Sequence, residues 1–254
     1  MAAAAGAAPA QARITEYPLD PTGTPVARAM AQNPTIVRRA VFPALPPNSK
    51  PVALSTTPLA GFPRHGSSYG ILTTGNARYA DDRNREPDRG AESGGPSVRG
   101  ARDVVIMRID LRVPRGANCL SFSFRFLSEE FPEFVHDIFN DAFIAEMDIS
   151  NWDASSKSDP TITAPRNFAR NAAGRPIRVN SVGTGRVSAS AASGTTYDGA
   201  TRILRARTRV KPGLHRLYLS IFDQGDRIYD SAVFIDRLVV ERRSSCKTGT
   251  VVDK

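Results

Sequence analysis

The sequence predicts an all-β protein, an antiparallel β-sandwich that is jelly-roll-like in outline, with long loops and little helix. Eight or so short apolar or alternating segments, separated by turn signals, are typical of that class. The 19 glycines and 19 prolines favour turns and irregular loops over long helices. A chain of 254 residues can form one large all-β domain or two small ones. No internal repeat is visible.

The chain divides by composition into three parts. Residues 1–34 are rich in Ala, Pro and Gly and predict a flexible lead-in, with a short helix around residues 25–32. Residues 35–242 contain the predicted strands and form the β-sandwich domain. Residues 243–254 are a C-terminal tail, either truncated or tied to the domain by a disulfide. The two cysteines, Cys119 and Cys246, could form that bridge or remain free thiols.

In the first half of the domain, the sequence predicts edge strands, then a long loop, then two regular strands. Residues 35–54 give short apolar runs broken by prolines, which indicates edge strands. Residues 77–100 are the most polar stretch and predict a long exposed loop. A strand with one face in water begins at Asp103, and a turn separates it from the next strand. In that next strand Phe122 and Phe124 alternate with serines, which places the phenylalanines on one buried face.

In the second half of the domain, the sequence predicts strands separated by long loops. The apolar pattern is lost over residues 148–175, which predicts a loop, and a short strand follows at 177–182. Further strands are expected at 201–210 and 214–222. The last strand, 231–240, is a nearly continuous apolar run, which is typical of a central position in a sheet.

Carboxylates gather in two loops of a chain whose net charge is +9, so general acidity does not explain them. One group follows the phenylalanine strand, and the other lies between the last two strands in DQGDRIYD. Clustered carboxylates repel one another unless a positive charge lies between them, and calcium takes six to eight oxygen ligands. The predicted calcium ligands are Glu129, Glu130, Asp141, Asp223, Asp226 and Asp230.

Convergence of the two loops depends on how the strands pair. If the last two strands pack beside the phenylalanine strand, their loop meets Glu129 and Glu130. Gly225 would let that loop fold tightly. The residues leave a second interpretation open, in which the acids form structural hydrogen bonds and ion pairs with arginines. The candidates for that role are Arg125, Arg227 and Arg237.

Catalytic signatures are weak, and the sequence predicts a protein that is not an enzyme, with no catalytic or organic cofactor-binding residues. Glu129 and Glu130 resemble the carboxylate pair of a glycosidase, but neighbours in a strand point to opposite faces. The histidines do not lie in a triad signature or at zinc-pair spacing. His136, inside the acidic loop, is the one histidine with several carboxylates near it in the sequence.

Arginines alternate along two predicted strands and could line one face of a sheet. They are Arg108, Arg112, Arg205, Arg207 and Arg209. Such a face would attract a polyanion, although a solvated strand face explains the same pattern. Nucleic acid is not the predicted partner, because no aromatic side chains for base stacking alternate with these arginines.

Five segments together resemble the choice-of-anchor L domain family of bacterial secreted and cell-surface proteins. FRFLSEEFPEF (124–134) and FNDAF (139–143) resemble the two central blocks of that family. YGILTTG (69–75), DGATRIL (198–204) and FDQGDRIYDSAVFI (222–235) resemble its flanking elements in the same order. The resemblance implies a β-rich domain and no known enzyme activity.

These features together predict an extracellular or cell-surface location after signal-peptide removal. The expected function is a calcium-binding module for adhesion or for recognition of an extracellular glycan, polymer or surface protein. A structural subunit of a bacterial surface assembly and an enzyme acting on an extracellular polysaccharide remain open as alternatives. No run of about 18 apolar residues appears, so no membrane span is predicted.

Overall fold

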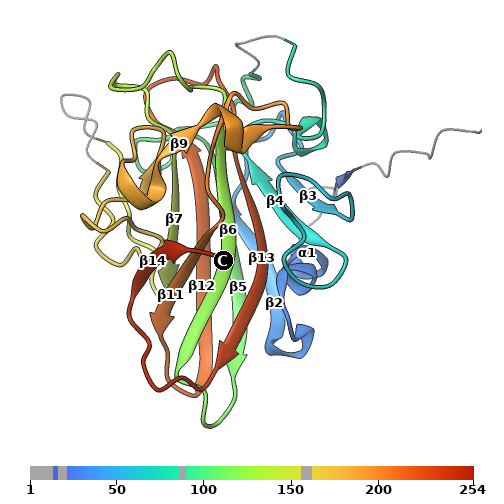
Figure 1. Ribbon diagram of the computed structural model, residues 1–254, viewed down its shortest axis with the longest axis vertical. Coiled ribbons are helices and arrows are strands. Elements are labelled where there is room, and N and C mark those ends of the chain that lie inside the picture. Colours follow the sequence, from blue (N-terminus) through green and yellow to red (C-terminus); the bar gives the residue numbers. More distant parts are fainter. Residues whose placement is uncertain (1–13, 17–21, 86–89, 156–161) are drawn as a thin grey trace, which may run out of the picture.

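The computed structural model describes residues 14–16, 22–85, 90–155 and 162–254, which form two antiparallel sheets packed face to face (Figure 1). The larger sheet contains β1 (Thr15–Glu16), β3 (Val52–Ser55), β4 (Tyr69–Thr73), β13 (Ser231–Glu241), β6 (Cys119–Ser128), β10 (Gly199–Thr201) and β9 (Val187–Ser188) in that order. It also contains β11 (Leu204–Arg209), which pairs with β6, and β14 (Gly249–Val252), which pairs with β11. The smaller sheet has the order β2 (Val37–Ala44), β5 (Arg102–Val113), β12 (Gly213–Asp223), β7 (Ala142–Met147) and β8 (Ile177–Arg178).

Over much of the chain, consecutive strands lie in different sheets. From β4 to β7 they alternate between the larger and the smaller sheet, and β11, β12 and β13 do the same. This alternation is the jelly-roll pattern, and the predicted all-β sandwich is confirmed. The described helices are short: α1 (Thr24–Met30) and the 3-10 turns Pro34–Ile36, Ala77–Tyr79, Gly183–Gly185 and Ala189–Ala192.

The main core lies between the two sheets and is centred on β6. Phe122, Phe124 and Phe126 are fully buried in it, as their period-2 alternation predicts. The rings of Phe124 and Phe143 lie 5.1 Å apart, so β6 contacts β7 of the facing sheet. β6 and β13 are both interior strands of the larger sheet, and β2 is an edge strand, as predicted.

The domain begins earlier than residue 35. In α1, Val26, Ala27 and Met30 are completely buried in the main core. The short helix expected around residues 25–32 is therefore present, but the part of the lead-in that contains it is packed into the domain. Two further lead-in residues, Thr15 and Glu16, form β1 and pair with β3, whereas residues 1–13 and 17–21 lie outside the described residues.

The predicted tail is also part of the domain. Cys119 and Cys246 form a disulfide with Cα atoms 5.6 Å apart, so the bridged state is the one of the two open alternatives that the structure shows. Beyond the bridge, β14 adds to the larger sheet by pairing with β11, so residues 249–252 extend the sandwich.

A single sheet face lined by all five arginines, one of the two interpretations left open by the sequence, does not form. Arg108 and Arg112 lie on β5 in the smaller sheet, whereas Arg205, Arg207 and Arg209 lie on β11 in the larger one. Alternation shows which residues share a side of a strand but does not show which sheet the strand joins. The arginines of β11 lie opposite Leu204 and Ala206, which face the core, and therefore point to the outer face of the larger sheet.

Candidate functional site

The predicted carboxylates meet at one end of the sandwich, where four strands begin or end. Glu129 and Glu130 directly follow β6, Asp141 precedes β7, and Asp223 is the last residue of β12. The β12–β13 loop contributes Asp226 and Asp230. At this end of the sandwich, Ser231 of β13 pairs with Ser128 of β6, and Phe222 of β12 pairs with Ala142 of β7.

The route by which the two loops converge differs in part from the prediction. β13 pairs with β6 as expected, but β12 lies in the facing sheet between β5 and β7. The β12–β13 loop therefore bridges the two sheets and reaches Glu129 from one side and Asp141 from the other. Gly225 in this loop has φ +109°, a conformation that favours glycine.

Backbone hydrogen bonds hold this carboxylate cluster together. The Glu129 N–H donates to the Asp230 carbonyl at 3.1 Å, and the Asp141 N–H donates to Glu130 Oε2 at 3.1 Å. The Gln224 N–H donates to Asp141 Oδ1 at 3.2 Å. Each loop is thereby tied to the other through groups of the cluster itself.

Burial of these acids is nearly complete. The exposed fraction is 1% for Glu129 and 0% for Glu130, Asp141 and Asp223. Several of their oxygens are buried without a hydrogen-bond partner of acceptable geometry: Glu129 Oε2, Glu130 Oε1, Asp141 Oδ2 and both oxygens of Asp223. An ionised carboxylate in such a place is costly unless a proton or a cation compensates it.

The pKa values reflect this cost. Burial, followed by repulsion from Asp198, raises the pKa of Glu129 to about 10. Burial raises the pKa of Asp141 to about 7. For Glu130 and Asp223, burial and the nearby Asp141 carboxylate both raise the pKa well above its ordinary value. In the absence of a cation, much of the cluster would therefore hold protons at neutral pH.

The arginines considered as ion-pair partners for the acids lie elsewhere. Arg125 Nη1 donates to the Ala191 carbonyl, Arg227 pairs with Glu92, and Arg237 approaches Asp253. Within the described residues, no Lys, Arg or His forms an ion pair with Glu129, Glu130, Asp141 or Asp223. Arg125, Arg227 and Arg237 therefore do not neutralise these four acids, whereas structural hydrogen bonds, the other part of that interpretation, are present.

One acid of this region was missing from the prediction. Asp198 lies just before β10, close enough to raise the pKa of Glu129, and its Oδ1 accepts a 2.6 Å hydrogen bond from Asn84. The signal was present, because Asp198 opens the DGATRIL element, but no acidic neighbour in the sequence drew attention to it. β10 pairs with β6 and so delivers Asp198 to Glu129.

Aromatic residues cover one side of the cluster. The rings of Phe134 and Tyr229 lie 5.0 Å apart, and the rings of Phe134 and Phe139 lie 5.5 Å apart. These contacts join the loop after β6 to the β12–β13 loop. Two isoleucines at the same end, Ile138 and Ile228, are each 57% exposed.

In the described part of the chain, no group of three or more His, Cys, Asp or Glu side chains has the spacing needed to bind a metal ion.

No helix of the described residues is both long and apolar enough to span a bilayer.

Solved structures resemble the fold only distantly. The carbohydrate-binding module TmCBM61, in complex with beta-1,4-galactotriose, aligns with a TM-score of 0.32 and 11% identity, covering 81% of this chain and 88% of that one. The enzymatically active domain of tailspike protein 4 from bacteriophage CBA120 aligns with a TM-score of 0.28 and 7% identity, covering 79% and 19% of the two chains. No curated protein matches in sequence.

The sequence itself matches the family model of the choice-of-anchor L domain over residues 70–238. This range contains the carboxylate cluster, β6 and most of β13, whereas α1, β2, β3 and β14 lie outside it. The match covers well over half of the 254 residues and includes the five sequence segments that resemble the family, apart from Tyr69 at the start of the first. The chain therefore belongs to the choice-of-anchor L domain family.

Proposed function

We propose that this chain is a secreted or cell-surface binding module in which a calcium ion, held by the carboxylate cluster, fixes the loops that contact a partner. The observation that carries the proposal is the set of buried, unpartnered carboxylate oxygens on Glu129, Glu130, Asp141 and Asp223. With no basic side chain of the described residues paired to them, a bound cation is the compensation that would let them ionise.

The donor set fits a hard cation. Every candidate ligand is a carboxylate, and calcium is bound by oxygen in flexible geometries of six to eight ligands. The cluster lacks the His and Cys ligands that zinc prefers. Asp226 and Asp230 are only partly buried, so they provide the side from which an ion would enter.

Ion binding would draw the loops together. The loop after β6 and the β12–β13 loop each contribute acids, and these acids repel one another when ionised. A cation between them would convert repulsion into attraction and fix both loops. Ile138 and Ile228, which are exposed on these loops, would then face a partner from a rigid frame. We assign the partner to the class of extracellular glycans or surface proteins.

The test is a thermal melt of chelator-treated protein with and without calcium, made on the wild type and on Asp223→Asn. Calcium at a hundredfold excess over its dissociation constant should stabilise the wild type by about 2.7 kcal/mol. For a domain of this size that is a rise of roughly 5–10 °C in Tm. Asp223→Asn should melt normally without calcium and gain little from it.

A matched control is Glu133→Gln, which removes an exposed carboxylate from the loop after β6. This variant should keep the full calcium response. If wild type shows no calcium-dependent rise, or if Asp223→Asn keeps it, the cluster does not bind calcium and the proposal fails.

A further inference from the structure

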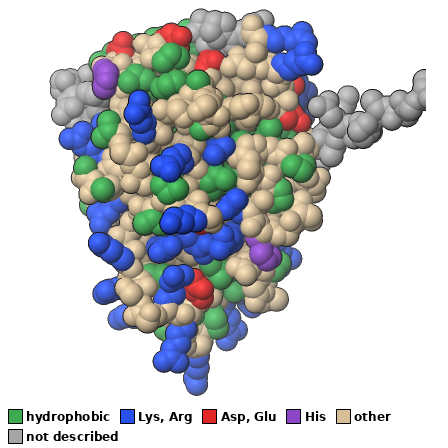
Figure 2. Space-filling view, in the orientation of Figure 1, with side chains coloured by type: hydrophobic (Ala, Val, Ile, Leu, Met, Phe, Trp, Pro, Cys, Tyr) green, Lys and Arg blue, Asp and Glu red, His purple; other side chains and the backbone are tan. Residues whose placement is uncertain are grey.

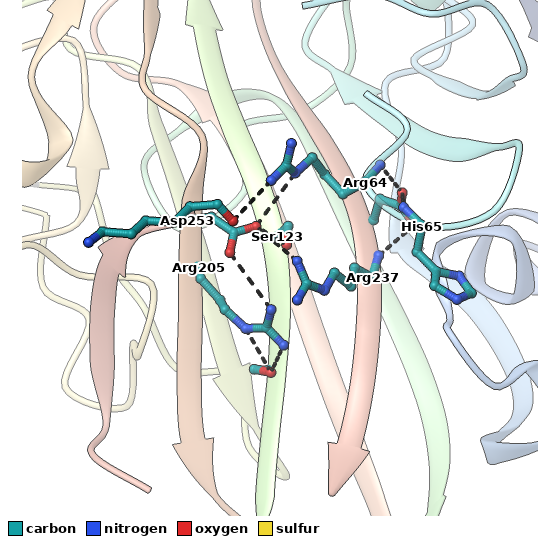
Figure 3. A network of polar contacts seen from close by, with 9 residues as sticks. Arg64, His65, Ser123, Arg205, Arg237 and Asp253 are labelled. Atoms are coloured by element: carbon teal, nitrogen blue, oxygen red, sulfur yellow. Dashed lines mark hydrogen bonds and ion pairs between the residues drawn. The ribbon is translucent and has the colours of Figure 1, made fainter. Parts of the chain in front are cut away.

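A second charged centre lies on the outer face of the larger sheet, where three arginines surround one carboxylate (Figure 3). Arg64 comes from the loop before β4, Arg205 from β11 and Arg237 from β13. The carboxylate belongs to Asp253, directly after β14. Its oxygens lie 3.6 Å from Arg64 Nε, 3.7 Å from Arg205 Nη1 and 3.7 Å from Arg237 Nη1.

Arg205 also donates from Nε and Nη2 to Ser121 Oγ, and Arg64 Nη2 donates to the Lys254 carbonyl, so the arginines are satisfied only in part. At 3.6–3.7 Å the contacts with Asp253 are ion pairs but not hydrogen bonds. Among the described residues, the one short bond to the carboxylate comes from Ser123, whose hydroxyl donates to Asp253 Oδ2 at 2.6 Å. Arg64 Nε is buried without a hydrogen-bond partner, although a guanidinium carries five N–H donors. The site therefore has donors left for additional anionic oxygens.

The local charge is strongly positive even with Asp253 in place. Burial, followed by repulsion from Arg64, lowers the pKa of Arg125, and burial, followed by repulsion from Arg237, lowers the pKa of Arg205. Asp236, the other nearby carboxylate, accepts hydrogen bonds from the backbone N–H groups of Arg64, His65 and Arg237. One further acid, Glu241, pairs with Arg243.

The centre can be reached from solvent. The side chains of Arg237 and Arg64 are 34% and 25% exposed, whereas those of Arg205 and Asp253 are almost buried. Figure 2 shows Lys and Arg side chains gathered in the middle of this face of the molecule. A ligand would therefore meet Arg237 and Arg64 first and compete with Asp253 for Arg205.

We infer that Arg64, Arg205 and Arg237 form a binding site for the oxyanions of an acidic polysaccharide, and that Asp253 occupies this site as an internal competitor. The carboxylate of Asp253 stands in for the carboxylate or sulfate of the ligand. This site is separate from the carboxylate cluster at the end of the sandwich, so the inference does not depend on calcium.

A polysaccharide fits this face better than nucleic acid does. Single-stranded nucleic acid is bound by pairing a basic groove with exposed aromatic platforms for the bases. The polar network in Figure 3 consists of arginines, serines, aspartates, His65 and Lys254, and Phe234 on the same strand as Arg237 is fully buried. Guanidinium groups recognise carboxylate and sulfate oxygens without stacking.

The experiment measures binding of the full chain to polygalacturonate and to dextran sulfate at low salt, with neutral dextran as the blank. The wild type should bind the acidic polymers with an affinity that falls as salt rises, and it should ignore dextran. Arg237→Gln should weaken binding by about tenfold. Asp253→Asn, which removes the competitor, should strengthen it several-fold.

Matched variants separate this site from general charge effects. Glu133→Gln adds the same positive increment as Asp253→Asn but lies in the loop after β6, and Arg112→Gln removes an exposed arginine from the smaller sheet. Both should leave the affinity nearly unchanged. Ser123→Ala, which removes the hydroxyl that holds Asp253, should strengthen binding in the same direction as Asp253→Asn and serves if that variant folds poorly.

Several outcomes would overturn the inference. If Asp253→Asn and Ser123→Ala leave the affinity for the acidic polysaccharides unchanged, or lower it, Asp253 is a structural partner only. Another such outcome is an Arg112→Gln effect as large as that of Arg237→Gln, which would show non-specific attraction. Preference for single-stranded DNA over both polysaccharides would contradict the ligand class. Preference between polygalacturonate and dextran sulfate would identify the oxyanion.

Discussion

At the scale of single residues, the carboxylate cluster makes stability depend on pH. The pKa of Asp141 rises from 3.8 to about 7 on folding, and that of Glu129 rises from 4.5 to about 10. Protons therefore bind the folded protein more tightly than the unfolded chain. The stabilising contribution of each group is complete below its unfolded pKa and is lost as pH rises through its folded pKa.

Calcium-free protein should accordingly be most stable near pH 4 with respect to these groups, and should lose stability as pH rises through 7 and toward 10. Calcium needs ionised carboxylates, so its stabilising effect should increase over the same range. Melts between pH 5 and pH 9, with chelator or with calcium, measure both trends. Calcium-free stability that increases steadily from pH 5 to pH 9 would contradict the assignment.

Gly75 supports the cluster through its lack of a side chain. A Cβ atom at this position would overlap the Asp230 carboxylate. Gly75→Ala should therefore displace Asp230 and the end of the β12–β13 loop, at a cost typical of overpacking, about 1–3 kcal/mol. Gly116→Ala makes a useful comparison, because its Cβ would meet nothing, although its positive φ adds a small strain. A calcium response in Gly75→Ala equal to that of the wild type would show that Asp230 is not needed.

At the scale of elements, β6 organises both the core and the cluster. Its inward phenylalanines fill the space between the sheets, and Glu129 and Glu130 follow its last residue. Truncation of a fully buried phenylalanine removes apolar surface and leaves a cavity.

Phe124→Ala should lower the free energy of unfolding by about 3–5 kcal/mol. It should also weaken the calcium response, because the strand that delivers Glu129 and Glu130 would be less well fixed. Chemical denaturation measures the first effect. Val251→Ala on β14, where the side chain is exposed at 44%, should change stability by less than about 0.5 kcal/mol. A loss in Phe124→Ala as small as that in Val251→Ala would contradict the central role of β6.

Alternation and turn signals predicted the strands well because they depend on local burial. Phe122 and its neighbours, the edge position of β2 and the interior position of β13 all followed from the sequence. Pairing depends on contacts between distant segments, and there the prediction was weaker. It placed β12 beside β6, whereas β12 lies in the facing sheet, and it left open a shared face for the arginines of β5 and β11, which lie in different sheets.

The same distinction holds for the carboxylate cluster. Local crowding of acids identified six residues that the structure brings to one end of the sandwich. Asp198 was missed because it stands alone in the sequence and reaches Glu129 only through the pairing of β10 with β6. Family resemblance extended the prediction further, since the five matching segments gave the order of elements that local periodicity does not provide.

At the scale of the whole molecule, the disulfide joins two segments that are 127 residues apart in sequence. Closing a loop of that length should stabilise the fold by roughly 4–5 kcal/mol in the chain-entropy description. Cys119→Ser with Cys246→Ser should lose about that much, as measured by chemical denaturation. The loss should be the same with and without calcium, because the bridge lies away from the carboxylate cluster. A calcium response that disappears in this double variant would show that the two are coupled.

The position of the bridge also determines how the molecule would resist a mechanical load. A pull on residue 254 would first peel β14 from β11, which releases only the short stretch beyond Cys246. The load would then pass through the covalent bond to Cys119, at the start of β6, an interior strand of the larger sheet. Single-molecule extension from that end should therefore show a small early yield followed by one large rupture.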